Sequence, residues 1–211
     1  MPEPVRLARS CSWIDVEFVE RDRTPKSIME LGILLHLSGL SRSNTTEIIA
    51  ALGVDRSKKA VHDWVHKADY ESPYDREIEE VALDETVVKI DGEQYWLFTA
   101  DDPATNQILL TQLNTARTTV VTEWFLRDLR DLHDVEAATF LVDRGQWLHA
   151  ELDEHDLDYR HETHGERNAI ERIYTQVKRR TPLFENTFRH ADPGTAETWL
   201  QAHAARLNSR N

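Results

Sequence analysis

Cysteine, lysine and long apolar runs are all scarce in this chain of 211 residues. The single cysteine, Cys11, excludes an internal disulfide and any cysteine-rich zinc site. No stretch approaches the roughly 20 apolar residues that a membrane-spanning helix needs, and the first residues contain no apolar run typical of a signal peptide. We therefore expect a soluble, intracellular protein. The length and a hydrophobic fraction of 40% allow one good-sized domain and a smaller one.

Basic residues are outnumbered, and lysine is the rarer basic type. The formal net charge is −13, and the basic residues are 19 Arg and 6 Lys. Residues 1–70 carry 10 basic and 10 acidic side chains, so the excess of acid comes from residues 71–211, with 15 basic and 28 acidic. Abundant acids with few lysines favour adaptation to high salt over the alternative, an ordinary acidic cytoplasmic enzyme. This balance is unusual for a protein that binds nucleic acid, and high salt would weaken its phosphate contacts.

The first third of the chain is predicted to be helical. Residues 1–23 show no period and are expected to form an arm or a short helix. Apolar periodicity and start and stop signals then predict three short helices over residues 24–67. Their inward-facing residues are predicted to be Leu31, Leu34, Leu35 and Ser38 in the first, Thr45, Ile48, Ile49 and Leu52 in the second, and Val61, Trp64 and Val65 in the third.

The second and third helices are separated by a turn at Gly53, and the third has polar residues near its start. This pattern is typical of a helix-turn-helix DNA-binding domain, although a helical cap on the following domain would give the same pattern. If the third helix reads DNA, its contacts are predicted to be Lys58, Lys59, His62 and His66.

The rest of the chain alternates strands and helices. A polar linker at 71–78 is predicted to separate a DNA-binding domain, 1–70, from a domain at 79–211. The expected strands are 81–90, 95–100, 108–113, 137–142 and 157–161, with a hairpin turn at Asp91-Gly92, and the expected helices are 118–132, 147–155, 167–180 and 195–207. The buried residues of the first of these helices are predicted to be Val121, Trp124, Phe125, Leu129 and Leu132. Three antiparallel strands followed by helix, strand, helix, strand and helix predict an α/β domain with a mixed five-stranded sheet, the order of the ribonuclease-H-like fold.

Three acids could carry chemistry in such a domain. Asp84 lies in the first strand, Asp143 directly follows the apolar run 137–142, and Glu171 borders the apolar stripe of a later helix. Individually they could be a strand-end residue, a turn residue and a surface ion-pair partner. An acid at the end of a buried strand is costly unless a metal ion or a base compensates its charge. Together they suit Mg²⁺ or Mn²⁺, and two such ions support phosphoryl transfer without a covalent nucleophile.

Three stretches resemble the insertion-sequence-six type of DDE transposases, particularly the short versions of halophilic archaea. TPKSIMELGILLHLSGLSRSNTTEIIAALGVDRSKKAVHDWVHK is similar to the DNA-binding region of that family, and VALDETVVKIDGEQYWLFTADDPATNQIL to its first catalytic segment. HGERNAIERIYTQVKRR resembles its third, in which Arg-Asn precedes the catalytic Glu. The resemblance implies catalytic, metal-binding roles for Asp84, Asp143 and Glu171.

By the same resemblance, the protein would be a homo-oligomer that binds double-stranded terminal inverted repeats and target DNA and transposes through a cointegrate. Two features depart from the family. Only 27 residues separate Asp143 from Glu171, and Arg144-Gly145 follows Asp143 where many relatives have a small residue and Pro. The second departure puts the geometry of that loop in question.

Residues 160–180 are locally basic, with six Lys or Arg against three Glu. This stripe could hold phosphates, or it could be a solvated helix face. The DNA contacts predicted here are Arg167, Arg172, Lys178 and Arg179. His161 and His164 could suggest zinc, but no further ligands are evident in the sequence.

The hypothesis is therefore a metal-dependent transposase in the cytoplasm, associated with the nucleoid. The alternatives are a helix-turn-helix regulator, an inactive transposase relic, or a ribonuclease-H-like nuclease or resolvase of another family.

Overall fold

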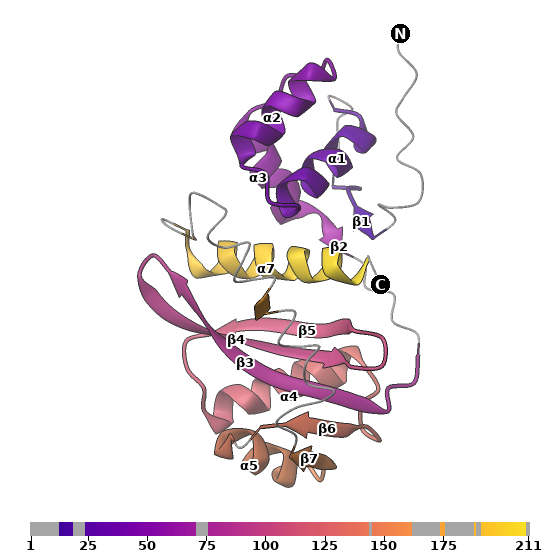
Figure 1. Ribbon diagram of the computed structural model, residues 1–211, viewed down its shortest axis with the longest axis vertical. Coiled ribbons are helices and arrows are strands. Elements are labelled where there is room, and N and C mark those ends of the chain that lie inside the picture. Colours follow the sequence, from indigo (N-terminus) through magenta and orange to yellow (C-terminus); the bar gives the residue numbers. More distant parts are fainter. Residues whose placement is uncertain are drawn as a thin grey trace.

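The computed structural model describes residues 13–18, 24–70, 76–143, 145–161, 174–175, 188 and 191–209. Three helices come first, a mixed sheet with two helices follows, and a long helix lies between these two parts (Figure 1). The N-terminal elements are β1 (Ile14–Asp15), α1 (Lys26–Leu37), α2 (Arg42–Ala51), α3 (Lys58–Lys67) and β2 (Asp69–Tyr70). The remaining elements are β3 (Glu80–Ile90), β4 (Glu93–Asp102), β5 (Gln107–Asn114), α4 (Thr119–Leu132), β6 (Thr139–Val142), α5 (Gln146–Glu154), β7 (Tyr159–His161) and α7 (Pro193–Asn208).

Serine caps set the starts of α2 and α3. The Ser41 hydroxyl accepts a hydrogen bond from the backbone N–H of Asn44 at 3.1 Å, and that of Ser57 accepts one from Ala60 at 3.2 Å. Such caps satisfy backbone donors that have no partner within the helix. The helix α2 therefore begins at Arg42, directly after its cap. Gly53 ends the turn after α2 with a φ of 87°, a conformation that favours glycine.

The buried faces of the first two helices differ from the prediction. In α1 the buried residues are Met29, Gly32, Ile33 and Leu37, whereas the predicted Leu31, Leu34, Leu35 and Ser38 are only half-buried. The reason is steric: at Gly32 a Cβ atom would lie 2.9 Å from the Trp64 ring, so α3 packs against the face that lacks a side chain.

In α2, Thr45 and Ile49 are buried, but Ile48 and Leu52 are 39% and 46% exposed. A helix of this length with neighbours on one side buries only a narrow stripe. In α3 the predicted inward residues Val61, Trp64 and Val65 are all buried, which confirms that part of the prediction.

The five-stranded sheet has the order β5-β4-β3-β6-β7. The pairs β5–β4 and β4–β3 are antiparallel, whereas β3–β6 and β6–β7 are parallel. Asp91 and Gly92 join β3 to β4 with φ angles of 48° and 90°, as a tight hairpin turn requires. This mixed sheet, with its order of strands and helices, is the ribonuclease-H-like arrangement that the sequence predicts.

Alternate residues of β3 face two different cores. Val81 and Leu83 belong to a core shared with α4 and α5, whereas Ala82 and Val88 belong to a core shared with α7. Trp124 and Leu132 of α4, both predicted to be buried, are 47% and 63% exposed. The buried stripe of α4 is narrower than the predicted one and is made by Val121, Thr122, Phe125, Leu126 and Leu129.

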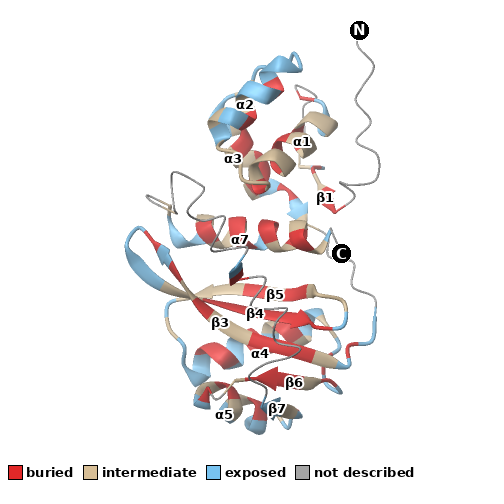
Figure 2. Cartoon of the chain, viewed as in Figure 1, coloured by how far each residue is buried: buried red, intermediate tan, exposed pale blue. Residues whose placement is uncertain are grey.

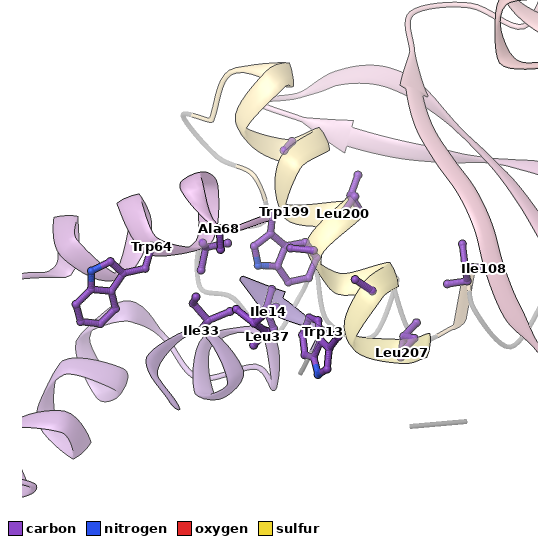
Figure 3. Close-up of a cluster of buried hydrophobic side chains, with 14 of the residues drawn as sticks. Trp13, Ile14, Ile33, Leu37, Trp64, Ala68, Ile108, Trp199, Leu200 and Leu207 are labelled. Atoms are coloured by element: carbon purple, nitrogen blue, oxygen red, sulfur yellow. The ribbon is translucent and has the colours of Figure 1, made fainter. Parts of the chain in front are cut away.

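The helix α7 packs on both of its sides. It contacts β5 on one side and α1 and α3 on the other, and buried positions recur along its length (Figure 2). Figure 3 shows Trp199 and Leu200 of α7 among Trp13, Ile33 and Leu37 of the N-terminal part. One hydrophobic core therefore runs from the N-terminal helices through α7 to one face of the sheet.

The arm and the residues that follow α3 form a small pairing that the sequence did not predict. Ile14 pairs with Tyr70, and Asp15 with Asp69, in an antiparallel β1–β2 ladder. Among the described helices, none combines the length and the apolar character that crossing a bilayer would require.

Candidate functional site

Asp84 and Asp143 come from neighbouring strands of the sheet. The parallel register of β3 and β6 pairs Val81 with Phe140 and Ala82 with Leu141. Continued by two residues, this register places Asp143, the residue directly after β6, beside Asp84. The two carboxylates, called here the acid pair, thus lie at the same level of two adjacent strands.

The acid pair also lies on one face of the sheet. Ala82 and Leu141, each two residues before an acid, both belong to the core on the α7 side. Side chains two residues apart in a strand share a face, so both acids belong to the α7 side. Both residues are half-buried, at the edge of this core.

The backbone after β6 holds the Asp143 side chain. The Gly145 N–H donates a hydrogen bond to Oδ1 of Asp143 at 2.7 Å, and the His149 ring lies 2.8 Å from the Asp143 carbonyl. A Cβ atom at Gly145 would lie 3.1 Å from Oδ1 of Asp143 and 3.0 Å from the Trp147 ring. The absence of a side chain at Gly145 thus lets the loop close tightly on this carboxylate.

Glu85 adds a third negative group beside the acid pair, on the opposite face of β3. Its side chain is only 3% exposed, and it pairs with Arg117 at 3.3 Å. Burial, together with the charges of Asp84 and Asp143, raises the pKa of Glu85 to about 7 against the lowering effect of Arg117. Burial is the largest cause of this shift, and the two neighbouring carboxylates add to it.

Tyr174 brings a distant segment of the chain to Asp84. Its ring is buried in the α7-side core, and its hydroxyl donates a hydrogen bond to the Asp84 carbonyl. Burial and then the Asp84 charge raise the pKa of Tyr174 well above its usual value, so the hydroxyl remains a neutral donor. Tyr174 and Thr175 are helical.

Arg117 lies between two tryptophan rings next to Glu85. Its Cζ atom is 4.2 Å from the centroid of the Trp96 ring and 4.5 Å from that of Trp147. Trp96 comes from β4, Trp147 from α5 and Arg117 from the segment between β5 and α4. We call these four residues, Glu85, Trp96, Arg117 and Trp147, the arginine clamp.

The predicted DNA contacts of α3 are not equivalent in the structure. Lys58 and Lys59 are exposed, and Lys59 forms an ion pair with Asp63 at 2.8 Å. His62 and His66 are half-buried, and their ring centroids are 4.1 Å apart. Burial, and then His62 and His36, lower the pKa of His66 to about 4, so His66 is neutral near pH 7. The two lysines are thus better placed than the histidines to contact phosphates.

Several predicted site residues lie outside the described part of the chain. These are Glu171, Arg167, Arg172, Lys178, Arg179 and His164. His161, the other half of the possible zinc pair, is exposed at the end of β7. Within the described ranges, no three His, Cys, Asp or Glu side chains are grouped closely enough to hold a metal ion. Of the residues predicted to bind metal, the described part therefore brings together Asp84 and Asp143.

The arginine clamp was not foreseen from the sequence. One signal was available for Glu85, because it continues the alternation of Val81 and Leu83 and so puts an acid on an apolar face. Arg117 gave no such signal, since a single basic residue before a helix is common. Its role depends on Trp96 and Trp147, which are distant in sequence.

Comparisons with known proteins give weak likenesses. No protein-family model matches this chain. An uncharacterized protein of Methanocaldococcus jannaschii is 24% identical over 192 residues, which are 90% of this chain and 89% of that protein. A solved structure of the HTLV-2 integrase catalytic core domain in complex with magnesium, in dimeric form, is 15% identical, covers 48% of this chain and 67% of that chain, and has a TM-score of 0.37. The function is therefore inferred from the residues of the site.

Proposed function

We propose that this chain is a transposase of an insertion sequence, of the insertion-sequence-six type, with Asp84, Asp143 and Glu171 as its catalytic acids. The observation that carries the proposal is the parallel register of β3 and β6, which aligns the acid pair on one face of a mixed sheet. Two carboxylates side by side on one face repel each other, and a divalent cation bound between them would offset that repulsion.

Tyr174 supports the inclusion of the third acid. It anchors its segment on the Asp84 carbonyl. Glu171 precedes Tyr174 by three residues, the spacing at which side chains of one helix lie on the same face. Glu171 is therefore the acid closest in sequence to the anchor point, and we assign to it the third position.

The acid pair fits a divalent metal ion in its chemistry. Carboxylate oxygens are the ligands that Mg²⁺ and Mn²⁺ prefer. Asp84 and Asp143, with Glu171, would hold the metal. When bound there, two such ions would stabilise the attacking and leaving oxygens of a phosphodiester.

The reaction would proceed by two displacements at phosphorus. In the first, water attacks a phosphodiester at the element end and the P–O bond to the 3′ oxygen breaks, leaving a free 3′-hydroxyl. In the second, this hydroxyl attacks a target phosphodiester, forms a new P–O bond and releases the target 3′ oxygen. The three acids would hold the metal ions, and the exposed Lys58 and Lys59 of α3 would contact the DNA backbone as part of a helix-turn-helix.

The test is metal-dependent cleavage and joining on short duplexes taken from the DNA that flanks the coding sequence, in high salt. Wild type is compared with Asp84→Asn, Asp143→Asn and Glu171→Gln, and with Asp131→Asn as a control at an exposed acid of α4. We expect joining with Mg²⁺ or Mn²⁺, none with chelator, and a loss of at least about 100-fold in the three site variants with duplex binding retained.

Two results would argue against the proposal. Duplex binding without joining under any metal would favour a DNA-binding regulator or an inactive relic. Cleavage of branched DNA regardless of its terminal sequence would favour a nuclease or resolvase.

A further inference from the structure

The arginine clamp joins four separate parts of the sheet domain at one cation. Arg117 precedes α4, Trp96 lies on β4, Trp147 lies on α5 and Glu85 lies on β3. A guanidinium group over the faces of two indole rings is attracted to both, because each ring face presents negative charge to it. The Arg117 side chain is 43% exposed, so the clamp closes at the protein surface.

Glu85 ties the clamp to the strand of the first acid. Its Oε1 atom lies 3.3 Å from Nη1 of Arg117, whereas its Oε2 atom is buried and has no hydrogen-bond partner among the described residues. A buried carboxylate depends strongly on the one cation that it has. Since Glu85 directly follows Asp84 in β3, a change in its position moves the backbone that carries the first acid.

Trp147 ties the clamp to the loop of the second acid. A side chain at Gly145 would meet both the Trp147 ring, at 3.0 Å, and Oδ1 of Asp143, at 3.1 Å. The Gly145 N–H holds the same oxygen at 2.7 Å. The Trp147 ring and the Asp143 carboxylate therefore border the same space at Gly145, which is too narrow for a side chain, and we expect a shift of the ring to disturb the second acid.

We propose that Arg117 is a positioning residue that fixes the geometry of the acid pair. It contacts the Trp147 ring, which lies near the Asp143 loop, and it pairs with Glu85, which is next to Asp84 in β3. This inference rests on the proposed function, because the geometry matters only if the acid pair acts on a phosphodiester. Arg117 itself touches neither acid in the described structure, and its effect passes through Glu85 and Trp147.

The test compares Arg117→Lys and Arg117→Gln with Arg127→Lys and Arg127→Gln. Arg127 is a matched control, because it lies on α4, is 61% exposed and, among the described residues, pairs with its neighbour Asp128. The measurements are Mn²⁺ affinity by calorimetry, single-turnover joining, the substrate concentration at half-maximal rate, and thermal unfolding. Trp147→Phe is a second variant that keeps an aromatic ring in the clamp.

We expect Arg117→Lys to fold like wild type, because it keeps the positive charge beside Glu85. Its joining rate should fall by roughly 10- to 100-fold, since misplacing reacting groups by a fraction of an ångström has effects of this order. The duplex concentration at half-maximal rate should stay within about 2-fold, and Mn²⁺ affinity should weaken. Arg117→Gln should show a larger loss, and the Arg127 variants should show none.

Two failures can be told apart. If wild type binds Mn²⁺ and joins DNA while the Arg117 variants match the Arg127 variants, the inference is overturned and the proposed function stands. If wild type neither binds Mn²⁺ nor joins DNA, the proposed function falls and this inference falls with it. The inference is also overturned if, in both Arg117→Lys and Trp147→Phe, the joining activity falls only as far as the amount of folded protein falls. That result would show that the clamp has a merely structural role.

Discussion

Replacing Tyr174 with phenylalanine removes one hydroxyl and leaves the ring in place. This hydroxyl donates to the Asp84 carbonyl, and the residue is 6% exposed within the α7-side core. Because the pKa of Tyr174 is raised well above its usual value, the hydroxyl donates its proton throughout the accessible pH range. The hydroxyl also lies 3.5 Å from the Leu97 carbonyl, so the substitution removes the hydrogen bonds of one hydroxyl, the short one to Asp84 above all, without a change of charge.

The expected loss of stability follows from the loss of this hydroxyl as a donor to the Asp84 carbonyl. A neutral hydrogen bond contributes about 1 kcal/mol net, and leaving a buried acceptor without its partner costs about 1–3 kcal/mol. We expect Tyr174→Phe to lower the free energy of unfolding by about 1–3 kcal/mol. For a chain of this size each kcal/mol corresponds to roughly 2–4 °C in melting temperature. Joining should fall further than duplex binding, because the segment that contains Glu171 loses its anchor at Asp84.

Urea unfolding of wild type and Tyr174→Phe measures the loss directly. Tyr95→Phe is the matched control, because Tyr95 is half-buried against the same core and its hydroxyl has no hydrogen bond among the described residues. It should change stability by less than about 0.5 kcal/mol. If Tyr174→Phe also stays within that range and joins DNA normally, Tyr174 does not hold this segment, and the assignment of Glu171 loses its support.

Two further perturbations test the helical core and the charge at Glu85. Gly32→Ala should lower the melting temperature by roughly 2–4 °C. The new methyl group would lie 2.9 Å from Trp64 and 3.0 Å from Ile49, and this crowding costs about 1–3 kcal/mol, which outweighs a helix-propensity gain of about 1 kcal/mol. A higher melting temperature would contradict this expectation. The pKa of Glu85 is about 7 in the folded chain and 4.5 ordinarily, so the folded state binds this proton more tightly, and stability should fall as pH rises from about 4.5 through 7. Urea unfolding in chelator at about pH 5 and pH 8 should show this fall as about 1–3 kcal/mol in wild type, and Glu85→Gln should lack it; equal pH dependence in both would refute it.

The sequence predicted those elements whose signals are local. The Asp91-Gly92 turn, the apolar strand before Asp143 and the inward face of α3 all follow from residues within a few positions of one another. The mixed sheet followed from the order of these elements. The two candidate acids came from the same reasoning, because each follows or interrupts an apolar strand.

Features that depend on distant partners were missed. Leu52 and Trp124 fit an apolar stripe, yet both are exposed, because no described element covers that side of α2 or α4. The pairing of Ile14 with Tyr70 joins two-residue strands far apart in the chain. The arginine clamp likewise depends on three elements, β3, β4 and α5, meeting at Arg117, and nothing near Arg117 in the sequence signals that meeting.

The position of α7 has a consequence for how the protein is made. This helix follows every other described element in the chain, yet it fills the space between α1, α3 and β5. During synthesis, the N-terminal helices and the sheet emerge from the ribosome before α7. Until α7 emerges, the apolar surface that each of them buries against α7 stays exposed. Completion of the fold is thus delayed until α7 emerges, and the two parts should then unfold together as one cooperative unit.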